Sequence, residues 1–182
     1  NNLKKGIKSL KKEYVFLFID DLIINKKISN KFFLKISNWV LQNDPNCLRL
    51  HISSQPKYFD GFVGKLPKKT PYKISTMPSI WKRSFLLKIL KNGESAWEFE
   101  ILGSKRAFSY GKFFSLNESF INYENSIIKG KWQRIIAKKL KIKGNLRPIM
   151  SHFEQKIYNL KLLRSKIFNF LPNSIRLKLK KY

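Results

Sequence analysis

Short unbroken apolar runs alternate along this chain with segments in which apolar residues recur every three or four positions. The run over residues 14–19 predicts a strand covered on both faces. Residues 47–52 alternate instead, with apolar side chains on one face and Arg49 and His51 on the other, which is typical of a half-buried strand. Further strands are expected over residues 73–80 and 108–116.

Helical spacing predicts the remaining elements of the first two thirds of the chain. Helices are expected over residues 3–12, after a cap at Ser29 or Asn30, over 81–90, and over 96–102 after a cap at Ser95. Residues 53–71 are expected to form a loop, because they contain two glycines and three prolines. Alternating strands and helices indicate an α/β fold.

The composition changes toward the C-terminus. From Ala137 onward there are 13 Lys and Arg, and Glu154 is the only acid. A helical apolar stripe is formed there by Phe153, Ile157, Leu160, Leu163 and Ile167. We therefore expect a domain over 1–135 and a basic amphipathic helical tail over 136–182. The tail could lie on an anionic membrane surface, or it could pack on the domain with its basic face in solvent.

Charge and cysteine content narrow the possible functions but do not identify one. The 182 residues suit one sizeable core. The net charge of +27 attracts phosphate, nucleic acid or anionic lipid, although a chain so rich in Lys, Ile, Asn and Phe also fits an AT-rich genome. Cys47 is the only cysteine, which excludes an internal disulfide and favours a cytoplasmic location. No apolar run approaches the roughly 20 residues of a membrane-spanning helix.

The first apolar run ends in two adjacent acids, Asp20 and Asp21. Consecutive strand residues point to opposite faces, so both can reach one ligand only if the chain turns there. Carboxylates at the end of a strand can hold Mg²⁺ or Mn²⁺ against a substrate phosphate. The alternative is that one Asp caps the next element and the other is solvated.

A second acidic cluster lies in NGESAWEFEILGSKRA, where Glu94, Glu98 and Glu100 surround Trp97. On a helix Glu98 and Glu100 lie about 200° apart, so only one of them can face a site. A carboxylate beside an indole in a cleft can have a raised pKa and act as a general base. The alternative is a helix start enriched in acids that interact with the helix dipole, with Trp97 in the core.

Four blocks together resemble the later part of bacterial GT-A glycosyltransferases related to the family 2 enzymes. They are, in order, YVFLFIDD, YKISTMPSIWKRSFLLKIL, NGESAWEFEILGSKRA and NYENSIIKGKW. The resemblance covers about residues 3–132 and implies a partial GT-A fold, which is an α/β fold with a mixed sheet flanked by helices. It also implies a nucleotide-sugar donor and a glycan or lipid-linked acceptor. It places Asp20 and Asp21 at the donor and its Mn²⁺ or Mg²⁺, although the usual motif is D-x-D rather than two adjacent acids.

The resemblance also assigns the other candidate residues. The W-E-x-E block implies a general base, with Glu98 as the first choice and Glu100 as the second. Trp81 and Trp97 are expected to border the acceptor, and Lys129, Lys131 and Trp132 to close over the diphosphate. The nucleotide-binding strands that precede the acidic motif in such enzymes are not recognised here, so residues 1–182 alone are predicted not to transfer sugar. An enzyme with a lipid-linked acceptor would work at the inner membrane face.

Two other classes of protein remain as alternatives. A receiver domain also has an acidic pair after an apolar strand, but its phosphoacceptor would be Asp60, which no apolar strand precedes. A nucleic-acid-binding module could use the lysines together with 4 Trp, 7 Tyr and 15 Phe as a basic stacking surface. The aromatic residues are mostly spaced as core residues, however, and no recognised nucleic-acid-binding motif is present. His51 and His152 are single, which gives no support to a histidine metal site.

Overall fold

The computed structural model describes residues 2–51, 58–68, 70, 72–143 and 146–170. The chain forms two compact units, Asn1–Glu124 and Asn125–Tyr182. The expected mixed α/β architecture is confirmed, since the described residues contain six helices and a mixed sheet. The predicted boundary after residue 135 falls inside helix α5 (Arg134–Lys139) of the second unit.

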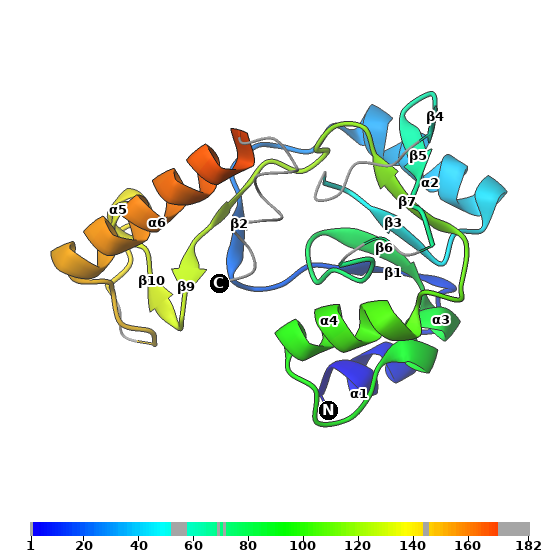
Figure 1. The fold of residues 1–182 in the computed structure, drawn as a ribbon, viewed down its shortest axis with the longest axis horizontal. Helices are drawn as coiled ribbons and strands as arrows, with labels where there is room; N and C mark the ends of the chain where they lie inside the picture. Colours follow the sequence, from blue (N-terminus) through cyan, green and yellow to red (C-terminus); the bar gives the residue numbers. More distant parts are fainter. Residues whose placement is uncertain (1, 52–57, 69, 71, 144–145, 171–182) are drawn as a thin grey trace. The chain divides into compact units, whose positions relative to one another are not determined.

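The first unit is built on a six-stranded sheet with the order β1-β6-β3-β7-β5-β4 (Figure 1). Strands β3 and β7 are parallel, and the other neighbouring pairs are antiparallel. The strands in spatial order are β1 (Tyr14–Leu17), β6 (Ser79–Lys82), β3 (Cys47–Arg49), β7 (Phe113–Leu116), β5 (Val63–Lys65) and β4 (Tyr58–Asp60).

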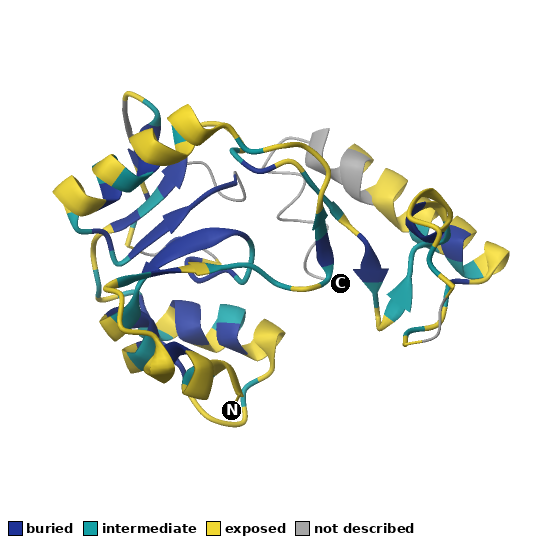
Figure 2. Ribbon diagram, turned by 180° about the vertical axis from the view of Figure 1, so that it is seen from behind, coloured by how far each residue is buried: buried dark blue, intermediate teal, exposed yellow. Residues whose placement is uncertain are grey.

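Helices cover both faces of this sheet, because alternate residues of each strand point to opposite sides. Ile7, Phe85 and Phe99 pack with Trp81 in one core cluster, while Ile36 packs in the other. The first cluster is covered by α1 (Asn2–Ser9), α3 (Arg83–Ile89) and α4 (Ala96–Arg106), and the second by α2 (Asn30–Asn43). Figure 2 shows the resulting pattern, with buried central strands and helices exposed on their outer faces.

Strand β1 differs from the expectation of a strand covered on both faces. It lies at the edge of the sheet and pairs only with β6 within the described residues, Val15 opposite Trp81. The side chain of Phe16 is 44% exposed. The apolar run therefore belongs to an edge strand, with one row of backbone groups not engaged by a described strand.

The helix expected over 81–90 was placed two residues too early. Trp81 lies in β6, and α3 begins at Arg83. The strand forms because Trp81 pairs with Val15 on one side and with Cys47 on the other, and these long-range pairings override the local helical spacing. The expected strand over 73–80 correspondingly begins only at Ser79.

Two further boundaries differ from the sequence-based expectation. The segment expected to be a loop contains the antiparallel pair β4–β5, with Gly61 at φ 60° in the turn. Asp60 ends β4, at the opposite edge of the sheet from β1, so the fold does not place it beside Asp20 and Asp21 as a receiver domain requires. Helix α4 continues to Arg106, and the strand after it, β7, starts at Phe113 rather than residue 108.

Asp44 joins the end of α2 to the sheet. It adopts a left-handed conformation, φ 47°, that closes the helix. Its carboxylate accepts hydrogen bonds from Tyr14 Oη at 2.8 Å, Lys82 Nζ at 2.6 Å and Lys112 Nζ at 2.9 Å. These donors, the Lys82 bond foremost, hold the pKa of Asp44 well below its usual range.

The second unit contains a small hairpin and two helices. The hairpin turns at Lys129 and Gly130, whose φ values of 50° and 77° are typical of a two-residue hairpin turn. Helix α6 starts with a capping box in which Ser151 and Glu154 exchange hydrogen bonds. Its elements are β9 (Ile127–Ile128), β10 (Lys131–Trp132), α5 and α6 (His152–Phe170). A separate two-stranded pairing joins β2 (Leu22–Ile24) and β8 (Tyr123–Asn125).

Among the residues that the structure describes, no helix has the length and apolar character that crossing a bilayer requires.

Candidate functional site

The acidic pair lies in a turn rather than on a strand. Strand β1 ends at Leu17, and the chain reverses over residues 19–22, where the Leu22 N–H donates to the Ile19 carbonyl at 3.3 Å. Asp20 is exposed and Asp21 is half-buried. The alternation that separates consecutive side chains on a strand therefore does not apply to them, which is the condition under which both can serve one ligand.

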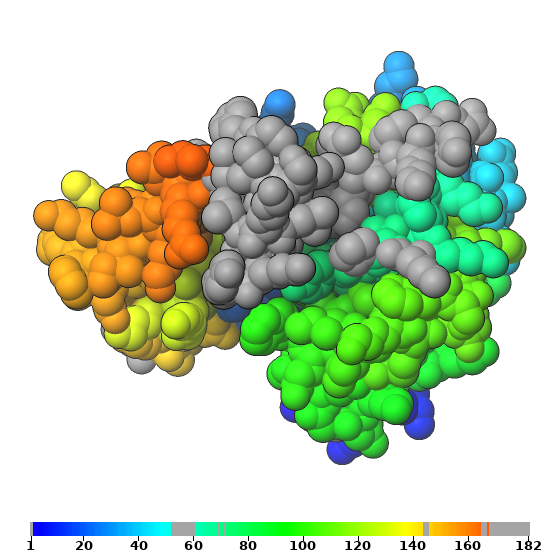
Figure 3. Space-filling model, viewed as in Figure 1, coloured from blue at the N-terminus to red at the C-terminus, as the bar shows by residue number. Residues whose placement is uncertain are grey.

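Helix α4 begins beside this turn with a complete capping box. Ser95 Oγ accepts from the Glu98 N–H, and the Glu98 carboxylate accepts from the Ser95 N–H at 2.8 Å. These hydrogen bonds from Ser95 lower the pKa of Glu98, which is opposite in sign to the raised pKa expected for a general base. Trp97 is 68% exposed, so it is not a core residue. Figure 3 shows the green segment that contains α4 at the surface of the first unit.

Glu100 is the inward-facing member of the W-E-x-E pair. Its Oε1 atom accepts from the Thr76 N–H at 2.6 Å, from Thr76 Oγ1 at 2.8 Å and from Ser75 Oγ at 3.3 Å. One turn further along α4, Ser104 Oγ accepts from the Ile74 N–H at 2.9 Å. Glu100 and Ser104 thus fix the segment that leads from residue 74 into β6. The expectation that the two glutamates diverge is confirmed, and Glu100 has a positioning role.

Replacing Glu100 with Ala is expected to lower the free energy of unfolding by roughly 2 kcal/mol, because the partly buried Thr76 N–H loses its acceptor. Glu100→Gln keeps an acceptor oxygen and should cost less. Glu98→Ala is the matched control on the same helix, and it removes only an exposed cap. Urea denaturation of the three variants measures the difference. Equal losses from Glu98→Ala and Glu100→Ala would contradict the positioning role.

A cavity of about 400 Å³, named here the acidic-turn pocket, brings the two acidic blocks together. Asp20, Thr76, Glu94 and Ser95 supply its polar lining. Glu94 is already engaged, because both of its oxygens accept from Arg106, at 2.6 and 2.7 Å. The rest of the wall is largely apolar, formed by Leu3, Leu17, Phe18, Ile19, Leu90, Ala96 and Phe99, together with Lys91. Neither Asp21 nor Glu98 or Glu100 lines it.

The oxygen donors at this pocket are compatible with a hard divalent cation. Within the described ranges, no three His, Cys, Asp or Glu side chains gather closely enough to form a metal site on their own. Mg²⁺ and Mn²⁺, however, are commonly held by one or two carboxylates, with substrate phosphates and water completing the shell. At this pocket Asp20 would supply such a carboxylate, whereas Asp21 belongs to the same turn but does not line the pocket.

Trp81 does not border an open site. Its indole has no exposed surface, and Nε1–H donates to Ser79 Oγ at 2.8 Å inside the core. The ring packs edge to face against Phe113. The predicted acceptor role is therefore corrected for Trp81, because its side chain is fully buried in the core cluster that α1, α3 and α4 cover. Only Trp97 of that predicted pair offers an exposed face.

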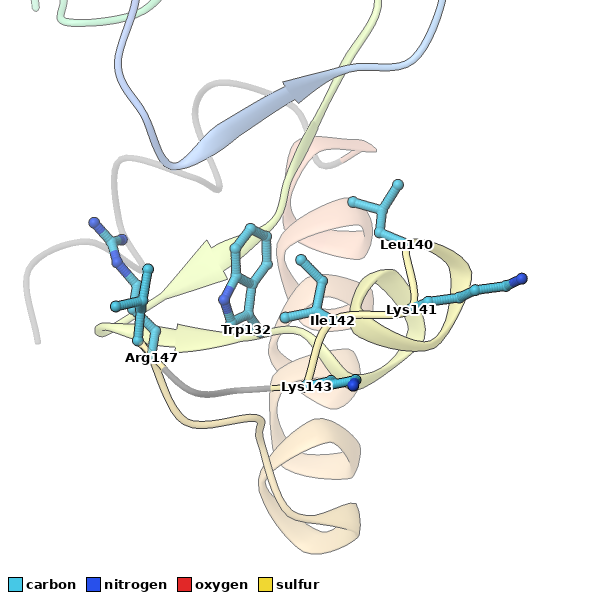
Figure 4. A pocket seen from close by; sticks show the side chains of 7 residues that line it. Trp132, Leu140, Lys141, Ile142, Lys143 and Arg147 are labelled. Atoms are coloured by element: carbon cyan, nitrogen blue, oxygen red, sulfur yellow. The ribbon is translucent and has the colours of Figure 1, made fainter.

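The three residues predicted to close over the diphosphate lie in the hairpin of the second unit. Lys129 is exposed at the turn, while Lys131 forms an ion pair with Glu154. Trp132 lines a second cavity of about 400 Å³ (Figure 4). Ile142 lies beside the indole, and the side chain of Lys141 extends away from it. Lys143 also lines the cavity. The lining of this cavity thus combines the Trp132 indole with the basic residues Lys141, Lys143 and Arg147.

The sequence-based reading missed Arg49 and His51 as buried polar residues. Both were expected on a solvent face, yet Arg49 is fully buried and His51 is 4% exposed. The Arg49 guanidinium donates to the Tyr72 carbonyl, and among the described residues no hydrogen-bond partner is found for His51 Nδ1. Burial, followed by the charge of Arg49, lowers the pKa of His51 to about 4, so the imidazole is neutral at pH 7.

Comparison with protein-family models, with curated proteins and with solved structures found no match. Function is therefore inferred from the residues that line the acidic-turn pocket and from the fold that positions them.

Proposed function

We propose that the chain is part of a GT-A-type glycosyltransferase that transfers sugar from a nucleotide-sugar donor to a glycan or lipid-linked acceptor. The observation that carries this proposal is that the turn after β1 and the start of α4 share one pocket, which Asp20, Thr76 and Ser95 line together. The same two blocks, YVFLFIDD and NGESAWEFE, carry the sequence resemblance to these enzymes. Two segments more than 70 positions apart thus meet where a donor and an acceptor would have to meet.

Each polar group has a proposed role that follows from its position. Asp20 and Asp21 would hold Mn²⁺ or Mg²⁺, which would offset the charge of the leaving nucleoside diphosphate. The apolar wall and the exposed Trp97 indole would contact a sugar ring. Glu100 positions the Ser75–Thr76 backbone rather than taking a proton.

The candidate general base is held in a hydrogen bond that must break before it can act. Glu98 is the glutamate left at the surface beside Trp97, but its carboxylate caps α4 and its pKa is lowered. A base with a lowered pKa accepts a proton less readily. For Glu98 to deprotonate an acceptor hydroxyl, it must release Ser95, which would raise its pKa toward the ordinary value for Glu.

The test is the melting temperature of the full-length protein with UDP, GDP and their sugars, with and without Mn²⁺. Ligands that bind only the folded state raise stability, by about 2.7 kcal/mol at a hundredfold excess over Kd. We expect a metal-dependent rise that Asp20→Asn and Asp21→Asn abolish. Glu118→Gln, which changes another acid of the first unit, is the matched control and should keep the rise. The absence of any rise with every nucleotide, or a rise that both Asp variants retain, would overturn the proposal.

A further inference from the structure

The apolar stripe of helix α6 faces away from the body of the second unit. Gln155, about 160° around the helix from Phe153, is the buried residue among the described side chains of α6, and it accepts from the Arg134 N–H at 2.8 Å. The stripe on the other side is exposed, with fractions of 72% at Phe153, 65% at Leu160 and 57% at Ile167. Ile157 and Leu163 belong to the same exposed stripe.

The residues around this stripe are positively charged. Lys156 and Arg164 fall within it on the helical projection, and both are exposed. Residues 125–182 contain 16 Lys and Arg against one acid, Glu154. That acid is neutralised locally, because it pairs with Lys131 and caps α6. No other acidic side chain in the sequence of residues 125–182 opposes an anionic surface.

We propose that α6 docks on an anionic lipid bilayer, with Phe153, Leu160 and Ile167 entering the headgroup boundary and Lys156 and Arg164 contacting lipid phosphates. An apolar helical face with interleaved cations fits the chemistry of such a surface, where burial and charge attraction act together. The single acid of the unit lies at the first turn of α6, engaged with Lys131. This membrane contact does not depend on sugar transfer, and it is measured without a nucleotide.

The experiment is cosedimentation of the full-length protein with large unilamellar vesicles of phosphatidylcholine alone or with about 30% phosphatidylglycerol. We expect binding to the anionic vesicles only, weakening with salt. Phe153→Asp and Leu160→Asp should each lower the partition coefficient about tenfold. Leu34→Asp is the matched control, since Leu34 is 61% exposed on α2 of the first unit, and it should bind as the unchanged protein does. Lys156→Gln should reduce binding roughly fivefold, whereas Lys26→Gln should leave it unchanged.

Four results would overturn the proposal. Equal binding to neutral vesicles would remove the role of lipid charge, and unchanged binding by Phe153→Asp would remove the role of the stripe. If another part of the protein covers the stripe, Phe153→Asp should lower the melting temperature, and the unchanged protein should not bind vesicles. Phe153→Ser removes the ring without adding a charge. A lower melting temperature of this variant as well would therefore indicate a covered ring rather than misfolding caused by a new charge. Binding to single-stranded oligonucleotides that is lost with Phe153→Asp, without vesicle binding, would instead assign the surface to nucleic acid.

Discussion

Trp81→Ala is expected to lower the free energy of unfolding by about 3–5 kcal/mol, the range for removing a large aromatic side chain from a core. The indole of Trp81 is fully buried between Val15 of β1 and Cys47 of β3. It packs edge to face on Phe113, with ring centroids 6.3 Å apart. Its removal leaves a cavity in the middle of the sheet and also leaves Ser79 Oγ without its indole donor.

Equilibrium urea denaturation followed by circular dichroism measures this loss. Trp81→Phe keeps a ring in the core and should cost clearly less than Trp81→Ala. Trp97→Ala changes the 68% exposed tryptophan of α4 and should remain within about 0.5 kcal/mol of the unchanged protein. If the Trp81→Ala protein kept the stability of the unchanged protein but no longer bound an acceptor, the predicted acceptor role of Trp81 would be restored.

The case of Trp81 also shows which parts of the fold local sequence can predict. Helices α2, α4 and α6 follow from apolar spacing, and α2 and α4 also from the caps expected at Ser29 or Asn30 and at Ser95, all of which are local signals. The helical spacing around Trp81 was equally regular, yet the residue lies in a strand. Its conformation is decided by pairing with Val15, 66 positions away, and no local pattern contains that information.

The burial of Arg49 and His51 has the same explanation. An alternating strand is half-buried only when one face of its sheet is open to solvent. Strand β3 is flanked by β6 and β7, and helices cover both faces of the sheet, so its polar positions are buried as well. Local alternation predicted the strand, although β3 ends at Arg49 and does not include His51. The number of layers around it depends on the whole fold.

The candidate site was likewise predictable only in part. The sequence showed that Asp20 and Asp21 need a turn to act together, and that Glu98 and Glu100 must diverge. Which glutamate faces inward depends on Ser75 and Thr76, more than 20 positions earlier in the chain. The lowered pKa of Glu98 depends on the cap at Ser95, which the sequence did reveal, although the cap was not connected to the pKa.

Lowering the pH from 6.5 to 4.5 is expected to destabilise the protein through His51. The native pKa is about 4, because burial and the nearby Arg49 charge oppose protonation, whereas an unfolded histidine has a pKa of about 6.5. Between these values the unfolded chain binds a proton that the native chain does not. The full stability is present above pH 6.5 and declines as the pH falls, by up to about 1.4 kcal/mol per pH unit and about 3 kcal/mol in total.

This contribution can be isolated because the chain has only one other histidine. Urea denaturation at pH 7 and 4.5 should show a steep loss of stability in the unchanged protein and a much smaller loss in His51→Gln. His152→Gln, which changes the exposed histidine at the start of α6, should retain the steep loss. Asp44 and Glu98 change stability in the same direction, because hydrogen bonds lower the pKa of each carboxyl, but both remain in every variant, so their contribution cancels in the comparison. If His51→Gln lost stability as steeply as the unchanged protein, some other group would have to take up the proton on unfolding, and His51 would be charged or solvated in the native state.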